Sequence, residues 1–205
     1  LKNLNKISLA SISLGKSTNE DFENSLSNYT KVSHFQFNTF SSKRMISAMA
    51  NELDEYNLVI INTDEINQKI DQMISSLVKK NKVILHYFGN KNALSTLSCL
   101  DKIEALIVAE TNSQKIKSKA GQLTFGGISC NGKLTEKIND EFIVGSGLSS
   151  KKIRLSFGDT ESTEIDGEKL LKIDTIIQEA IKAKAFPGCQ IIAAKDGHVF
   201  LNKSY

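Results

Sequence analysis

Residues 57–64, with the sequence NLVIINTD, are a short apolar run that ends in polar residues, which predicts a buried strand. Further strands are predicted at 6–15, 31–37, 82–90 and 103–110. The segments between them carry apolar residues three and four positions apart, as helices do, at 19–29, 41–56, 66–80, 92–100 and 113–127. Strands that alternate with helices predict an α/β fold, a doubly wound and mostly parallel sheet with helices on both faces.

Ser41 and Ser42 open the helix predicted at 41–56, and their hydroxyl groups can cap its first turn. In a sheet covered on both faces, the strands are buried along their length. We therefore expect burial of the strands centred on Ile12, Val59, Ile84 and Ile107.

Polar side chains mark the carboxyl ends of the predicted strands, where ligands bind in sheets of this kind. They are Asn62, Asp64, Asn90 and Glu110. Two of the four are carboxylates, which could do acid–base work or hold a small ligand. A second explanation is that strands end where solvent begins, and that Asp64 and Asn90 cap the helices that follow.

Composition and motifs exclude several classes of function. The net charge is only +3, with 26 basic and 23 acidic residues, which predicts no nucleic-acid partner. No apolar run approaches the roughly 18 residues that span a bilayer. The sequence holds no dinucleotide or phosphate-loop glycine motif, and its three distant cysteines have no metal-ligand spacing, so we expect neither cofactor nor metal. His86 lies mid-strand and is expected in the core, whereas His34 and His198 are expected at the surface.

The last third of the chain differs in character. Residues 149–166 are rich in Ser, Gly and charge and predict a linker. A strong amphipathic helix is predicted at 167–185, and a β-hairpin with an Asp-Gly turn at 189–205. Because a helix and a hairpin alone leave apolar faces bare, we expect this tail to dock on a neighbouring copy, forming a homo-oligomer, or to be readily proteolysed.

Two stretches resemble known families. The tail "IDTIIQEAIKAKAF", "PG" and "CQIIAAKDGHVFLNKSY" resembles the opening of the serine β-lactamase-like hydrolases. The body resembles the carboxy-terminal α/β domain of glycoside hydrolase family 3, through "NLVIINTD", "NKVILHYFGNKNAL", "QLTFGGISCNGKLTEKINDEF" and "GSGL". Lys91 and Thr135 stand where that family usually has proline. The resemblance implies a family 3 domain at 1–148, a linker at 149–166 and a β-lactamase-like fragment at 167–205.

The order of these modules is similar to that of bacterial β-N-acetylhexosaminidase fusion proteins. It implies a parent glycosidase that acts on N-acetylglucosamine-containing glycans in the periplasm or cell envelope, with the carbohydrate held through a barrel domain that this chain lacks. The nucleophile of the family lies on that barrel, and "SSKK" at 149–152 matches the lactamase motif S-x-x-K only by chance, in the linker. We therefore expect the chain to be catalytically silent. A stand-alone module that binds a small ligand or partner is the alternative.

Overall fold

The computed structural model describes residues 1, 3–15, 19–37, 43–160 and 163–205. These residues form two compact units, Leu1–Lys151 and Lys152–Tyr205. Within the described residues, no helix is both long enough and apolar enough to cross a membrane.

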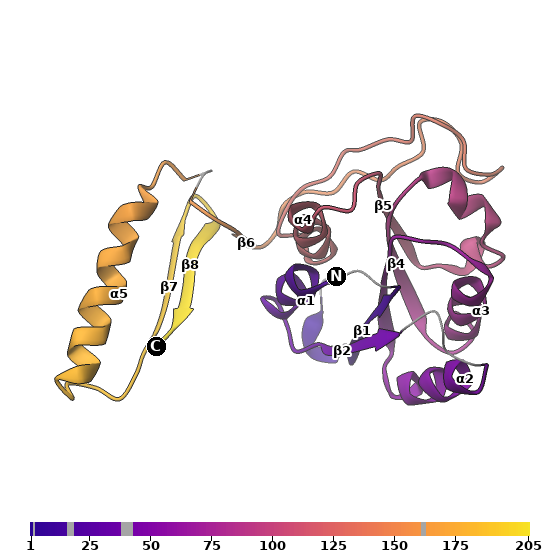
Figure 1. Cartoon of the computed structure of the whole chain (residues 1–205). Coiled ribbons are helices and arrows are strands. Elements are labelled where there is room, and N and C mark those ends of the chain that lie inside the picture. The colour runs from indigo at the N-terminus through magenta and orange to yellow at the C-terminus, as the bar shows by residue number, and fades with distance from the viewer. Residues whose placement is uncertain (2, 16–18, 38–42, 161–162) are drawn as a thin grey trace. The chain divides into compact units, whose positions relative to one another are not determined.

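The first unit is built on a five-stranded sheet in which all paired strands are parallel (Figure 1). The strands are β1 (Leu9–Leu14), β2 (Ser33–Phe37), β3 (Leu58–Thr63), β4 (Lys82–Phe88) and β5 (Ala105–Ala109). Their order across the sheet is β2-β1-β3-β4-β5. The α/β class and the doubly wound parallel sheet predicted from the sequence are therefore confirmed.

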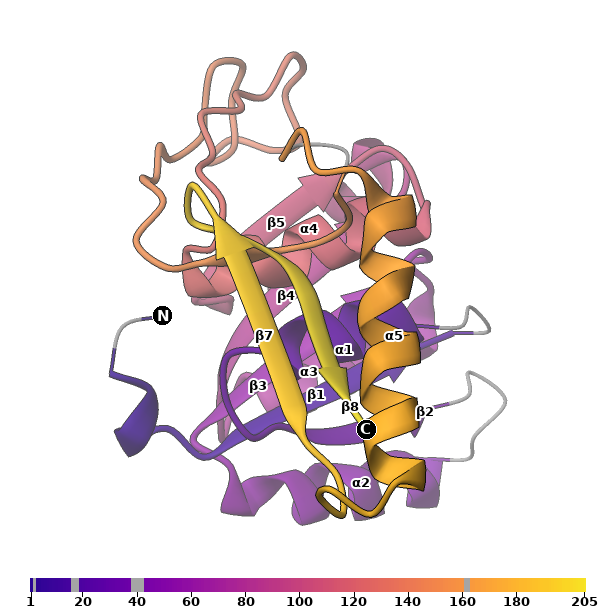
Figure 2. The same cartoon turned by 90° about the vertical axis from the view of Figure 1, so that its left-hand side faces the viewer.

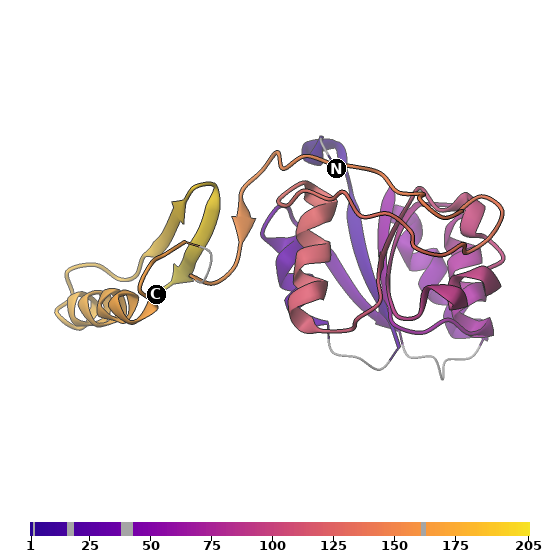
Figure 3. The same ribbon diagram turned by 90° about the horizontal axis from the view of Figure 1, so that it is seen from above.

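Helices cover both faces of this sheet (Figures 1 and 3). Helices α1 (Glu20–Ser27) and α4 (Gln114–Phe125) pack on one face, and α2 (Lys43–Glu52) and α3 (Gln68–Leu77) on the other. Successive strand residues point to opposite faces, so Ile60 packs under α1 and α4 while Ile61 packs under α2 and α3. Two separate apolar cores result, and the sheet lies between them.

Some local predictions need correction. The helix predicted at 92–100 is instead two 3₁₀ turns, at Lys91–Thr96 and Leu100–Lys102. The hydroxyl groups of Ser95 and Thr96 donate to carbonyl groups three residues back, which competes with helical hydrogen bonding. Ile107 is only half-buried, because β5 is an edge strand. Ser41 and Ser42 lie outside the described residues.

The second unit combines a small sheet with one helix (Figure 2). Its elements are β6 (Ser156–Phe157), α5 (Gly167–Lys182), β7 (Gln190–Lys195) and β8 (His198–Ser204). Asp196 and Gly197 turn the β7–β8 hairpin with φ angles of 51° and 76°, as an Asp-Gly hairpin turn requires. The segment expected to be a linker contributes β6, which pairs in parallel with β8.

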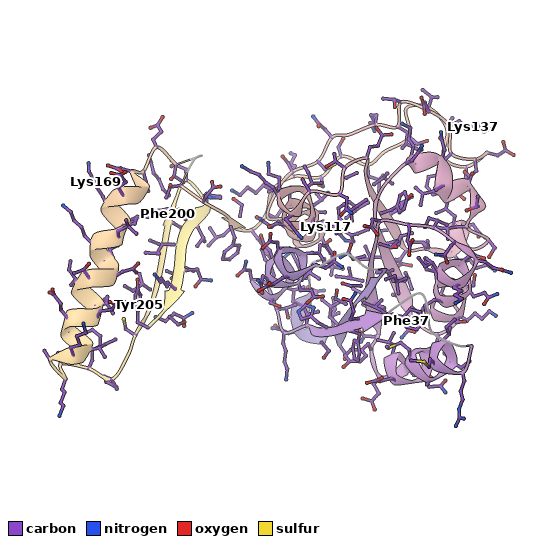
Figure 4. All side chains as sticks on the ribbon, viewed as in Figure 1. Phe37, Lys117, Lys137, Lys169, Phe200 and Tyr205 are labelled. Carbon is purple, nitrogen blue, oxygen red and sulfur yellow. The ribbon has the colours of Figure 1, made fainter. Side chains whose placement is uncertain are left out.

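The core of the second unit is thin. Among its described residues, Val199 is the one apolar side chain that is fully buried. Leu171, Ile176 and Ile192 are 64%, 62% and 60% exposed. Polar contacts add to the attachment of the helix, because Lys203 and Tyr205 at the end of β8 both donate to the Asp174 carboxylate of α5. Tyr205 is labelled in Figure 4.

A glycine determines how closely α1 and α4 approach each other. A Cβ atom added at Gly121 of α4 would lie 1.9 Å from the Ser25 Oγ of α1. The Ser25 hydroxyl cannot easily turn away, because it donates to the Phe22 carbonyl oxygen. We predict that Gly121→Ala lowers the free energy of unfolding by about 1–3 kcal/mol through overpacking, as measured by urea denaturation.

Gly132→Ala is the matched control, because a Cβ atom there meets only the Cys130 Sγ at 3.9 Å. It should change stability little. Adding Ser25→Ala to Gly121→Ala should recover part of the loss, because the contacts that remain, with the Ser25 Cβ and the Leu26 Cδ2, are 3.2 Å and 3.4 Å. A Gly121→Ala variant as stable as the control would contradict this account of the α1–α4 contact.

Candidate functional site

The strand order creates a switch point at the carboxyl end of the sheet, and we call the residues that converge there, Gly15, Asp64, Gly89 and Asn112, the crevice. The order reverses between β1 and β3, and the chain leaves these two neighbours towards helices on opposite faces. In doubly wound sheets, the carboxyl ends of such a strand pair are the usual place for ligands. Gly15 follows β1 and Asp64 follows β3, so both lie at this point. A Cβ atom on Gly15 would lie 3.3 Å from the Asp64 Oδ1.

Asp64 is the half-buried carboxylate of this crevice. The Asn112 side-chain amide, which follows β5, donates to its Oδ2. Gly89 follows β4, and a side chain there would crowd this point. An added Cβ atom would lie only 2.9 Å from the Asp64 carbonyl oxygen and 2.7 Å from the Tyr87 hydroxyl. Burial, and after it the Asp64 carboxylate, raise the pKa of Tyr87. Segments that follow four strands therefore converge around Asp64.

Lys117 of α4 brings a buried amine towards the same end of the sheet (Figure 4). It is 2% exposed, its Nζ donates to the Asn19 Oδ1 at 2.8 Å, and the Nζ lies 5.7 Å from the centre of the Phe88 ring. Burial lowers the pKa of Lys117, and the Asp64 carboxylate opposes that shift. The sequence prediction missed this residue. The sequence feature that indicates it is helical spacing, because Lys117, Gly121 and Thr124 lie on the buried face of α4.

Below the crevice, a row of polar side chains crosses the sheet under α1 and α4. Ser13, Asn62 and His86 are register neighbours on β1, β3 and β4. The Ser13 hydroxyl donates to the Glu23 Oε1 at 3.2 Å, and the His86 Nε2 lies 2.9 Å from the Thr124 hydroxyl. Among the described residues, the Nδ1 atom of His86 and both polar atoms of the Asn62 side chain have no hydrogen-bond partner.

Asn90 and Glu110 serve a different arrangement. The Asn90 side chain accepts from the Asn92 amide and caps the 3₁₀ turn that follows β4. Lys91, which is 8% exposed, bonds the Glu110 carboxylate and lies 3.4 Å from the Glu136 carboxylate. These hydrogen bonds, with Glu110 first, outweigh burial and raise the pKa of Lys91. This ion cluster ties β5, the 3₁₀ turn and the later loop together.

The four residues predicted from the sequence therefore separate. Asp64 lies in the crevice, Asn62 lies beneath it with only 1% of its surface exposed, and Asn90 and Glu110 are exposed and engaged in local contacts. The capping role suggested for Asn90 is present. The one suggested for Asp64 belongs to Asn67, whose side chain accepts from the Lys69 and Ile70 amides of α3. Among the described residues, no three His, Cys, Asp or Glu side chains form a group that could hold a metal.

Comparison with known proteins bears on the fold. No protein-family model matches the sequence, and no curated protein does. A solved structure of a glycoside hydrolase family 3 β-N-acetylglucosaminidase from Paenibacillus sp. str. FPU-7 is similar, with a TM-score of 0.50 and 9% sequence identity. The match covers 58% of this chain and 25% of that one. It shows a likeness of fold to part of a family 3 glycosidase, and this chain spans about a quarter of that enzyme.

The buried histidine predicts how the first unit responds to acid. Burial lowers the pKa of His86 from 6.5 to about 3. The stability that neutral His86 contributes to the free energy of unfolding is therefore fully present above pH 6.5. It is lost as the pH falls towards 3, by up to about 1.4 kcal/mol for each pH unit. We predict that urea denaturation at pH 7 and pH 5 shows a larger loss of stability in the wild type than in His86→Gln.

His34→Gln is the control, because His34 is exposed, as expected from the sequence, and the desolvation that lowers its pKa is opposed by the Glu23 carboxylate. Its loss of stability on acidification should stay close to that of the wild type. Equal pH dependence in the wild type and His86→Gln would mean that His86 is not held neutral in the folded chain.

Proposed function

We propose that the first unit is a non-catalytic domain of a glycosidase of the β-N-acetylglucosaminidase type. In this proposal it lines a site for N-acetylglucosamine-containing glycans, and a separate barrel domain supplies the reacting carboxylates. The observation that carries the proposal is the likeness of its fold to part of a family 3 β-N-acetylglucosaminidase. The motifs at 57–64, 81–94 and 122–142 add support, because they resemble the same family.

The chemistry of the crevice suits a sugar of this kind. An N-acetylglucosamine unit offers hydroxyl and amide donors and one amide acceptor. The Asp64 carboxylate accepts hydrogen bonds, and the Asn112 side chain next to it both donates and accepts. Hydrogen bonds to a charged group contribute about 1.5–3 kcal/mol each. Asp64 is therefore the residue whose loss should weaken glycan binding most.

Hydrolysis needs more than this crevice holds. Retaining glycosidases use two carboxyl groups about 5–5.5 Å apart, one as nucleophile and one as acid. Asp64 bonds the Asn112 amide and Glu110 bonds the Lys91 ammonium, so each is engaged in a contact within the domain. We predict that the chain does not turn over 4-nitrophenyl N-acetyl-β-glucosaminide or nitrocefin. Turnover that survives repurification, and is lost in Glu110→Gln or Asp64→Asn, would refute the non-catalytic assignment.

Glycan binding can be measured by NMR on the ¹⁵N-labelled chain. We expect N,N′-diacetylchitobiose to shift the amide signals of Gly15, Asp64 and Asn112, and cellobiose, which lacks acetamido groups, to shift them less. Asp64→Asn should weaken binding about tenfold or more, and Asp101→Asn, an exposed aspartate elsewhere on the domain, should not. Chemical shifts that stay unchanged with millimolar chitobiose would contradict a sugar-lining role.

We further propose that the second unit is the opening segment of a β-lactamase-like domain. The support is the order of its elements, in which α5 leads through Pro187 and Gly188 into an antiparallel hairpin with an Asp-Gly turn. This is the order that the tail sequence shares with that family.

A stand-alone small-ligand module is the second candidate, and one observation favours it. The Asn62 amide and the His86 Nδ1 are buried side by side without a partner among the described residues, and Lys117 lies on the same face of the sheet. Such groups fix the orientation of small polar ligands in other proteins. A small polar compound that shifts the Asn62 side-chain amide signal, in a chain that ignores chitobiose, would favour this function over the first.

A further inference from the structure

Three polar side chains meet around one serine hydroxyl in the second unit. Ser156 of β6 pairs in register with His198 of β8, and the Ser156 Oγ lies 3.0 Å from the His198 Nδ1. The Lys152 ammonium donates to the same Oγ at 3.0 Å. The second ring nitrogen of the histidine, Nε2, lies 3.0 Å from the main-chain carbonyl oxygen of Asp159. Neither the fold nor the glycan proposal assigns a role to this group.

The carbonyl oxygen decides how the protons are arranged. A carbonyl oxygen only accepts hydrogen bonds, so the His198 Nε2 carries the proton and donates to Asp159. In a neutral imidazole, the Nδ1 is then an acceptor for the Ser156 hydroxyl at 3.0 Å, closer than the competing acceptor, the Gly197 carbonyl oxygen at 3.4 Å. The result is a nucleophile bonded to a base, with the base oriented by a third group, which is the logic of catalytic serine triads.

The surrounding backbone holds this geometry in place. Lys152 also donates to the Gly197 carbonyl oxygen at 2.8 Å, and the Ser156 amide donates to the same oxygen at 3.0 Å. Gly158 makes room for the imidazole, because a Cβ atom there would lie 3.0 Å from the His198 Cε1. Ser156 itself is 7% exposed, so the serine is sheltered on most sides without being sealed off from solvent.

We propose that Ser156 is a nucleophile for acyl transfer from small esters, with His198 as its general base. The Ser156 Oγ attacks the ester carbonyl carbon while its proton passes to the His198 Nδ1. The tetrahedral intermediate collapses, the bond to the alcohol breaks, and that proton leaves on the departing alcohol. Water then hydrolyses the acyl-serine by the same base. The negative charge of the tetrahedral intermediate develops on the former carbonyl oxygen of the ester, and the Lys152 ammonium, 3.0 Å from the Oγ, stabilises that charge.

This activity is independent of the glycan proposal. It uses residues of the second unit alone, and its substrates are carboxylic esters, whose cleavage needs no pair of carboxyl groups. The chain can therefore be silent towards glycosides and still react here, and the failure of either proposal leaves the other standing.

The test is covalent labelling of the full chain with a fluorophosphonate probe, followed by peptide mass spectrometry. We expect the label on Ser156, and a labelling rate at least 100-fold lower in His198→Gln, since a general base contributes about 10²- to 10⁴-fold. Ser156→Ala should remove the label. Ser204→Ala, an exposed serine on β8, should leave it unchanged. The initial burst of 4-nitrophenol from 4-nitrophenyl acetate should follow the same pattern. It should be present in the wild type and Ser204→Ala, much slower in His198→Gln and absent in Ser156→Ala.

A second variant separates reactivity from folding. Ser156→Cys keeps a nucleophile at the same place, and we expect iodoacetamide to alkylate the introduced thiol faster than Cys130 or Cys189, which are half-buried. Circular dichroism of each variant checks that the fold is retained. Folded wild type that carries no label on Ser156, or that labels as fast when His198 is replaced by Gln, would overturn the proposal.

Discussion

Burial of β3 on both faces is the constraint on which the first unit depends. All six residues of this strand are buried, so its backbone hydrogen bonds must be satisfied by neighbours, and both of its faces must be covered. Strand β1 and strand β4 supply the hydrogen bonds, and one pair of helices covers each face. The strand order reverses beside β3, between β1 and β3, and Asp64 lies where the reversal occurs.

Sequence reasoning identified the fold through features that are local. The apolar run of β3 and the apolar stripe of α3 each reveal the type of element within a few residues, because the spacing of apolar residues follows the buried face. The strand order and the edge position of β5 depend on contacts between distant segments, so they are not visible in a local pattern. The 3₁₀ turns after β4 were mistaken for a helix because an apolar stripe of nine residues does not reveal that Ser95 and Thr96 bond back to the main chain.

The candidate site was only partly predictable for the same reason. The ends of strands mark where polar residues emerge, and Asp64 was found in this way. The face of the strand and the partners of a side chain decide where a polar residue lies. For this reason Asp64 lies in the crevice, Asn62 lies under the helices, and Glu110 lies at the surface. Lys117 was missed because a lysine is normally assigned to the surface. The role of Ser156 depends on a parallel pairing between segments 42 residues apart in sequence, which no local pattern reveals.

The polar row of Ser13, Asn62 and His86 also bears on how the sheet selects its alignment during folding. A slip of two residues between parallel strands keeps every side chain on its own face, so apolar alternation alone does not penalise it. Such a slip of β4 would place Ile84 or Phe88 beside Asn62 in place of His86. His86 would also leave the level at which it meets the hydroxyl of Thr124. A few polar atoms inside an apolar core can thus serve as an alignment mark that distinguishes the native sheet from its nearest misfolded competitors.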